Sequence, residues 1–194
     1  MNFCDDGFEV IKDAVNTQTL ELLKIQFRMM KDNSDFAENC SLGDGQVPNS
    51  FGWYGAYCFE SLMLLLQKDV EKIIQKKLLP CYSYARIMQK GAIMEKHKDR
   101  PSCEYSATIC ISQDKKCPYP IFIEDYSGKV HEIVLQPGSM MVYNGTELNH
   151  WREKYKGKEH IQAFIHFVNS RGKYKDFKFD KRPGLGLGSE TREI

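Results

Sequence analysis

The sequence predicts an α+β fold, mainly β, in which N-terminal helices brace a β-sandwich or open barrel. Over residues 17–31 and 55–77, apolar side chains recur at the three- and four-residue spacing of amphipathic helices. Beyond Pro80 the apolar period becomes two, and short runs rich in β-branched and aromatic residues alternate with turn sequences. Helices followed by many strands of similar length favour this layered arrangement.

The length and composition indicate one domain. A chain of 194 residues with 42% hydrophobic residues can bury one good core and is too short for two comfortable domains. We expect a single domain over residues 1–180, made of a helical N-terminal part (about 1–80) and a β core (about 81–170). The glycine-rich, charged residues 181–194 have little to bury, and we expect a mobile tail there.

The charge, hydropathy and cysteine content exclude several classes of protein. Lys and Arg number 27 against 26 acidic residues, so the net charge of +1 gives no long-range attraction for nucleic acid or an anionic membrane. The longest apolar run is far shorter than a membrane span, and the N-terminus lacks a signal-peptide pattern. Seven cysteines without a CxxC pair argue against a disulfide framework and a zinc ribbon. We expect a cytoplasmic protein without a membrane partner, of undetermined oligomeric state, and do not favour nucleic acid as a partner.

The elements follow one another along the chain. Residues 32–55, between the two helices, are rich in Asn, Asp, Ser, Gly and Pro, which is typical of a long loop, and loops of this length often cover a site. Whether this loop is a lid stays open. The strands that we predict occupy residues 82–89, 104–112, 120–125, 129–135, 139–143 and 160–168.

Three residues have the chemistry of a metal site. His97 and Asp99, in the stretch EKHKDR, are two positions apart, and on a strand such residues point to the same side. Imidazole nitrogen and carboxylate oxygen suit iron, and two histidines with one carboxylate leave open positions for a substrate and dioxygen. A His-x-Asp tripeptide alone is a weak signal. His150 is the best third candidate. A Pro-Gly turn and a short apolar strand precede it, and they can bring it to the same open end of the barrel as His97 and Asp99.

From about residue 82 to residue 168 the chain resembles the Fe(II)- and 2-oxoglutarate-dependent oxygenases, specifically the prolyl 4-hydroxylase-like group. The shared parts are, in order, the strand YSYARIM, Gly91, HKD, the strand YSATICI, the turn QPGS, His150 and the strand HIQAFIHFV. The resemblance implies a double-stranded β-helix (jelly-roll) core. It also implies that His97, Asp99 and His150 are the catalytic residues and the iron ligands.

The resemblance implies an enzyme, a dioxygenase that uses Fe(II), dioxygen and 2-oxoglutarate as co-substrate. Such an enzyme hydroxylates a C–H bond and releases succinate and carbon dioxide. The prolyl hydroxylase-like lineage makes a protein or peptide side chain a reasonable substrate. A small-molecule substrate stays open, and nothing in the sequence specifies proline.

The chain departs from the family pattern where the far carboxylate of 2-oxoglutarate is bound. Ten residues after the distal histidine, where the family usually has Arg or Lys, stands His160, and Gln162 takes the place of a Ser or Thr. Because a histidine anchor is sensitive to pH, other cations are candidates to share or replace it, Arg152 first and then Arg86. Thr108 aligns with the inward threonine of the family and is a further candidate for this pocket.

Some polar residues have structural interpretations instead. His131 and His166 are expected to be structural, and Arg100 is explained equally well by a salt bridge to Glu104 as by a role at the metal mouth. Arg152 and Arg86 also have surface alternatives, as an ion pair and as a brace of the barrel exterior.

Two other classes of function stay open on the sequence. The stretch before His150 is also similar to a cupin motif, which favours a cupin-like metal-binding enzyme or sensor that does not use 2-oxoglutarate. Cupins favour HxH in their first motif, however, and this chain has HxD. The second of these classes is a non-catalytic module that lost co-substrate binding. The retention of all three candidate ligands argues against this hypothesis.

Overall fold

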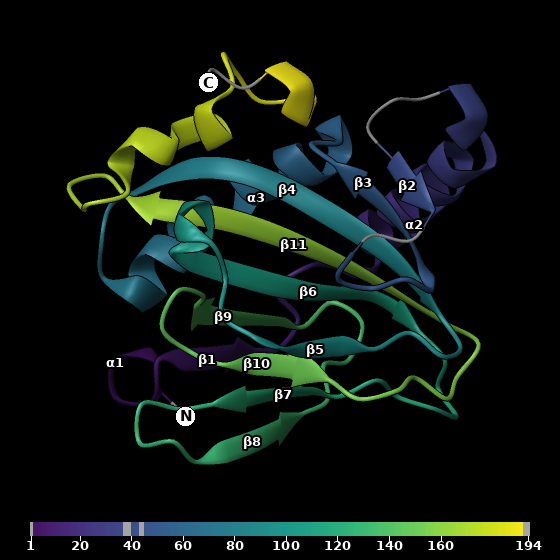
Figure 1. Cartoon of the computed structure of the whole chain (residues 1–194), viewed down its shortest axis with the longest axis horizontal. Helices are drawn as coiled ribbons and strands as arrows, with labels where there is room; N and C mark the ends of the chain where they lie inside the picture. Colours follow the sequence, from purple (N-terminus) through teal and green to yellow (C-terminus); the bar gives the residue numbers. More distant parts are fainter. Residues whose placement is uncertain (1, 37–39, 43–44, 192–194) are drawn as a thin grey trace.

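The computed structural model describes residues 2–36, 40–42 and 45–191, and in these residues two antiparallel β-sheets face each other (Figure 1). The larger sheet has the strand order β1 (Phe8–Ile11), β9 (Met140–Asn144), β6 (Tyr105–Gln113), β11 (Glu159–Asn169), β4 (Leu78–Gln89), β3 (Ser50–Tyr54) and β2 (Cys40–Leu42). The smaller sheet has the order β5 (Met94–His97), β10 (His150–Arg152), β7 (Ile121–Glu124) and β8 (Val130–Ile133). This is the jelly-roll core that the sequence predicted.

Helices cover the outer face of the larger sheet. They are α1 (Phe3–Asp6), α2 (Thr17–Asp32) and α3 (Tyr57–Ile74). The short 3-10 helices are η1 (Ser34–Phe36), η2 (Pro101–Cys103), η3 (Lys175–Lys181) and η4 (Ser189–Thr191), and η2 and η3 pack in a separate cluster with Tyr82. Leu23 and Phe27 of α2 and Phe59 of α3 belong to the same buried apolar cluster as the outward side chains of the sheet. Among the described residues, none of the helices combines the length and the apolar character needed to cross a membrane.

All six predicted strands and both predicted helices are present, but the N-terminal part is less helical than expected. Strand β1 pairs with β9, and β3 pairs with β4, so residues before 80 complete the larger sheet at both sides. The segment 32–55, expected to be a loop, contains η1, β2 and β3. Part of that segment, residues 37–39 and 43–44, lies outside the described residues. Strands β5 and β10 were also not predicted.

Strand alternation separates the two faces of the larger sheet by chemistry. On β11 the odd residues, such as Ile161 and Ile165, pack against the helices, and β4 and β6 alternate in the same way. The opposite faces of these strands carry polar and aromatic side chains between the two sheets, namely Tyr82, Tyr84, Arg86, Ser106, Thr108, His160, Gln162 and His166. The interior between the sheets is therefore built to contain polar chemistry.

The C-terminal segment packs on the protein and differs from the expected mobile tail over its described part. Arg182 is buried, donates from Nη2 to Glu60 Oε1 of α3 at 2.7 Å and stacks over the Tyr54 ring. The backbone N–H of Gly186 donates to the other oxygen of the same carboxylate. Burial raises the pKa of the Glu60 carboxyl, and these hydrogen bonds oppose the rise. The C-terminal segment packs on the protein because the buried Glu60 carboxylate of α3 requires the hydrogen-bond donors of Arg182 and Gly186.

We predict that Arg182→Met destabilises the protein by about 3–5 kcal/mol, because it leaves the Glu60 carboxylate buried without its cation. Chemical denaturation measures the free energy of unfolding. Adding Glu60→Leu in the same chain should recover most of the loss, since the unpaired charge is then gone. The control Lys72→Ala breaks the exposed pair with Asp69 and should change stability by less than about 0.5 kcal/mol. A small effect of Arg182→Met would contradict this account.

Candidate metal centre and its cavity

The register between two short strands places two histidines side by side. Strand β10 pairs with β5 so that His150 lies opposite His97, and the ring centroids are 4.3 Å apart. Asp99 follows β5, and its backbone N–H donates to Gly145 O at 2.8 Å. A Cβ at position 145 would lie 2.4 Å from Asp99 Oδ2, so only glycine in this turn allows the carboxylate its position.

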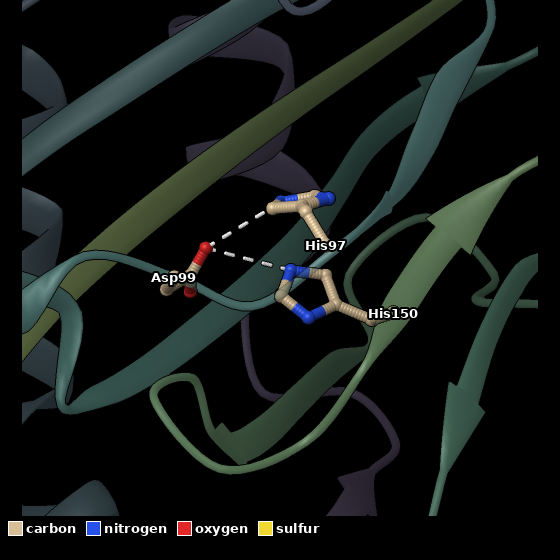
Figure 2. Close-up of side chains that lie close together, drawn as sticks. All are labelled: His97, Asp99 and His150. Carbon is tan, nitrogen blue, oxygen red and sulfur yellow. Dashed lines mark ion pairs between the residues drawn. The ribbon is translucent and has the colours of Figure 1, made fainter.

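His97, Asp99 and His150 converge on one point, as the sequence predicted they could (Figure 2). Asp99 Oδ1 lies 3.6 Å from His97 Nε2 and 3.5 Å from His150 Nε2. The dashed lines in Figure 2 mark these two pairs, and the side chains come from β5, the segment after it and β10. The three donor atoms are thus close enough together to bind one metal ion.

Hydrogen bonds on the far side of each ring fix which nitrogen faces the aspartate. His97 Nδ1 is 2.8 Å from Glu95 O, and His150 Nδ1 is 3.1 Å from Leu148 O. A carbonyl oxygen can only accept, so both Nδ1 atoms carry the proton and, in the neutral rings, both Nε2 atoms present lone pairs. His97 Nε2 also lies 2.8 Å from Gln46 Nε2, from which it can accept. The two lone pairs and the Asp99 carboxylate oxygen face one another, an arrangement that a cation between them stabilises. The donor set therefore fits a divalent metal ion.

The carboxylate of Asp99 is held ionised. Burial would raise its pKa, but the polar contacts with the imidazoles of His150 and His97 outweigh burial and hold the pKa of Asp99 well below its usual range. Its second oxygen, Oδ2, accepts from Ser106 Oγ at 2.9 Å. Ser106 thus fixes the orientation of the carboxylate, a contribution that the sequence analysis missed.

A cavity of about 300 Å³ opens beside the three residues. Several aromatic side chains line it, with Tyr54, Tyr82, Tyr84 and Phe164 among them. The complete lining consists of Gln46, Tyr54, Tyr82, Tyr84, Arg86, Met94, His97, Asp99, Arg100, Ile121, Tyr143, His150, Phe164 and His166. Gln46 and Tyr54 come from the segment 32–55, so the described part of that segment does contribute to the site.

Four of the candidate co-substrate residues form one buried polar cluster. Arg152 Nη2 donates to Gln162 Oε1 at 2.6 Å, His160 Nε2 lies 3.1 Å from the same oxygen, and Gln162 Nε2 donates to Thr108 Oγ1. The Arg152 guanidinium also stacks 4.7 Å from the centre of the Tyr119 ring. The cluster joins β10 of the smaller sheet to β11 and β6 of the larger one.

Arg152 is a buried cation without an acidic partner among the described residues. Its side chain is 1% exposed, and its Nε has no hydrogen-bond partner in that part of the chain. Burial lowers the pKa of Arg152 to about 10, which still leaves it charged at neutral pH. Burial and the nearby Arg152 charge lower the pKa of His160 far below its usual value, so His160 is neutral. The surface alternative for Arg152, an ion pair, is therefore wrong, because the side chain is buried.

Arg86 and Arg100 lie elsewhere than the sequence suggested. Arg86 lines the cavity, donates to Gln46 Oε1 at 2.8 Å and stacks over Tyr84, so it does not brace the exterior. Arg100 binds Asp180 with both guanidinium nitrogens at 2.7 and 2.8 Å instead of Glu104. The partner was not foreseen because it lies eighty residues further along the chain, in η3.

The two remaining histidines differ. His131 pairs with Asp125 at 2.7 Å outside the cavity, as a structural histidine would. His166 lines the cavity next to Asp99, which the structural interpretation did not foresee. Burial lowers the pKa of His166 to about 4, so the ring is neutral, and its Nδ1 lies 2.9 Å from Ser106 Oγ.

Comparisons with known proteins agree with this architecture. No family model matches the sequence, and no curated protein matches it. Solved structures do match. A prolyl-4-hydroxylase from Pseudomonas putida superposes with a TM-score of 0.69 and 12% identity, over 88% of this chain and 96% of that one. The chain has the fold of the 2-oxoglutarate-dependent oxygenases.

Two further structures support the same fold. HygX from Streptomyces hygroscopicus, with nickel and 2-oxoglutarate bound, gives a TM-score of 0.67 at 13% identity, over 87% of this chain and 85% of HygX. SnoN, a non-heme alpha-ketoglutarate-dependent epimerase from nogalamycin biosynthesis, gives 0.73 at 8% identity, over 87% and 79%. The similarity covers most of this chain in both cases, so the shared fold is not confined to the candidate metal centre.

We predict that Asp99→Asn lowers the affinity for Fe(II) by more than about 100-fold with little loss of fold, because a neutral amide replaces the only anionic ligand of the three. Anaerobic titration followed by metal analysis measures the affinity. The matched control is Asp125→Asn, which removes a carboxylate that also pairs with a histidine but lies outside the cavity. Wild-type affinity in Asp99→Asn would remove this residue from the metal site.

Proposed function

We propose that this protein is an Fe(II)- and 2-oxoglutarate-dependent dioxygenase that hydroxylates a C–H bond. The observation that carries the proposal is the pairing of two features in one β-helix core. Three metal-binding donor atoms converge at the cavity, and a buried arginine without an acidic partner in the described chain lies two residues along β10 from one of them. A metal and a dicarboxylate are the ligands that this pair of features would attract.

His97 Nε2, Asp99 Oδ1 and His150 Nε2 would hold the iron. When bound, the iron supplies a centre at which 2-oxoglutarate and dioxygen meet and an oxidation strong enough for a C–H bond takes place. The chain's own task is to keep the donors in place. Glu95 O and Leu148 O orient the imidazoles.

Arg152 would bind the far carboxylate of 2-oxoglutarate. A buried guanidinium is costly without an anion, and a carboxylate offers it a charge-assisted, two-point partner. The family places this cation on the last strand, where this chain has the neutral His160. Arg152 reaches across from β10 to Gln162 on β11, so the positive charge arrives at nearly the same place from the facing sheet. His160, Gln162 and Thr108 would then orient this cation.

The primary substrate would enter the aromatic cavity beside the metal. The side chains of Tyr54, Tyr82 and Tyr84 would shield the reacting bond from water and present flat surfaces against which a side chain or a ring can pack. A protein or peptide side chain and a small molecule both fit these features. The cupin-like alternative is not favoured, since the similar structures named above include 2-oxoglutarate-dependent enzymes.

The decisive experiment is an anaerobic titration of the Fe(II)-loaded protein with 2-oxoglutarate, followed by visible absorption. We expect the weak charge-transfer band of bidentate keto-acid chelation, and we expect it to be lost in Asp99→Ala. Bound iron without this band would favour the cupin-like function. A protein that binds neither iron nor 2-oxoglutarate would be a non-catalytic module.

We predict that Arg152→Met raises the 2-oxoglutarate concentration needed for half-maximal turnover by about 10- to 100-fold, the loss of one or two charge-assisted hydrogen bonds. Iron binding should stay at one equivalent, because no metal ligand is changed. The control Arg28→Met removes an exposed arginine that pairs with Glu159 on the surface. If Arg152→Met keeps the wild-type dependence on 2-oxoglutarate, Arg86 becomes the next candidate for the anchor.

A further inference from the structure

A tyrosine hydroxyl and a cysteine thiol touch each other beside the candidate metal centre. Tyr82 Oη lies 3.2 Å from Cys103 Sγ, and both side chains are buried. Cys103 Sγ, a carboxylate oxygen of Asp99 and a ring nitrogen of His166 all lie within 4.8 Å of one another. Tyr82 lines the same cavity as the candidate ligands. The function proposed above uses the Tyr82 ring as a cavity wall but gives no role to the contact between its hydroxyl and the Cys103 thiol.

The surroundings hold the tyrosine ring still. The Tyr82 ring stacks on Tyr54, with centroids 4.9 Å apart, and packs against His166 at 4.5 Å. The Arg100 guanidinium lies 4.6 Å from its centre, and Asp180 fixes both Arg100 and the Tyr54 hydroxyl. The ring therefore cannot swing away from the thiol.

The backbone holds the thiol in place from the other side. Cys103 ends η2, shortly after the candidate ligands His97 and Asp99, and its carbonyl oxygen lies 3.2 Å from Ser106 Oγ. Two reactive groups fixed in contact need little further ordering to react, which removes much of the entropic barrier. The phenol of Tyr82 and the thiol of Cys103 can both be oxidised, and any oxidant produced at the candidate metal centre would form next to them.

We propose that Tyr82 and Cys103 become joined by a thioether bond between Cys103 Sγ and the ring carbon beside the hydroxyl-bearing carbon. The proposal rests on the proposed function, which supplies the oxidant. The Cys103 S–H bond and one ring C–H bond of Tyr82 break, and one C–S bond forms. One oxygen atom of dioxygen enters succinate as 2-oxoglutarate loses carbon dioxide, and the other takes up the two hydrogens and leaves as water.

The link would tie strand β4 to the segment that carries Asp99. It would fix one aromatic wall of the cavity relative to the metal ligands, and it would form when no substrate occupies the cavity and takes the oxidant instead. The modification would thus be made once, by the protein on itself, and would persist through later turnovers.

The test starts from the full chain, purified without metal or oxygen and fully reduced. It is given Fe(II), 2-oxoglutarate and air without any other substrate. We expect the intact mass to fall by two hydrogen atoms and to stay lowered after treatment with a thiol reductant. After tryptic digestion, the peptides 78–86 and 99–115 should run as one species, with fragmentation placing the link between Tyr82 and Cys103. Succinate is measured in the same sample.

Variants identify the two residues that form the link. Tyr82→Phe and Cys103→Ser should each abolish the linked peptide at wild-type iron stoichiometry. Cys110→Ser, which changes another buried cysteine in the same tryptic peptide, should retain it. Linkage in Tyr82→Phe, or a link that the reductant cleaves, as it would a disulfide to Cys81, overturns the proposal.

The outcomes separate this proposal from the function on which it rests. If succinate forms and the two peptides stay separate, the thioether is refuted and the oxygenase function stands. If the protein binds no iron and makes no succinate, the oxygenase function fails and the thioether fails with it.

Discussion

The site depends on the register of β5 against β10, which sets His150 opposite His97. With this register both imidazoles point to the same side, and Asp99, tied by its N–H to Gly145, completes the group. A shift of one residue would turn one histidine to the opposite face of the sheet and remove it from the centre. Strand β10 is held on both sides, by β5 and by β7, so this register is fixed by the whole smaller sheet.

The interior between the sheets concentrates charge that elsewhere in a protein would be exposed. Asp99, in the segment after β5, is partly buried, Arg152, at the end of the neighbouring strand β10, is fully buried, and both are ionised. The aspartate accepts a hydrogen bond from Ser106 and lies beside the imidazoles of His97 and His150, whereas Arg152 is stabilised by neutral acceptors and by the Tyr119 ring. This asymmetry gives the interior a preference for a cation at one end and an anion at the other.

The sequence predicted the elements whose signals are local. The alternation in YSYARIM and the helical spacing of residues 17–31 reflect burial on one face, which is written into neighbouring residues. The candidate ligands were found because two of them lie within one tripeptide and the third follows a recognisable turn. Strands β5 and β10, with four and three residues, are too short for a period of two to be visible.

Other features could not be predicted because they depend on contacts between distant segments. Asp180 binds Arg100 from a backbone in which Phe179, Asp180 and Lys181 all have positive φ, a conformation that no propensity suggests. Arg152 was ranked first as the anchor, yet only the structure shows that it reaches Gln162 from the facing sheet. His166 was given a structural role because its strand reads as ordinary core, although its face of β11 borders the cavity.

The position of β11 has a consequence for how the protein is made. This late strand lies inside the larger sheet, hydrogen-bonded along its length to β4 on one side and β6 on the other. Strand β1, which is synthesised first, likewise cannot pair until β9 has been made, since Phe8 lies opposite Tyr143. A chain emerging from the ribosome therefore exposes the unpaired edges of β4 and β6 until residue 169 has been synthesised. Closing such distant pairings is slow and leaves those edges open to other chains meanwhile. This topology makes the protein most vulnerable to aggregation while the chain is being synthesised, rather than after it has folded.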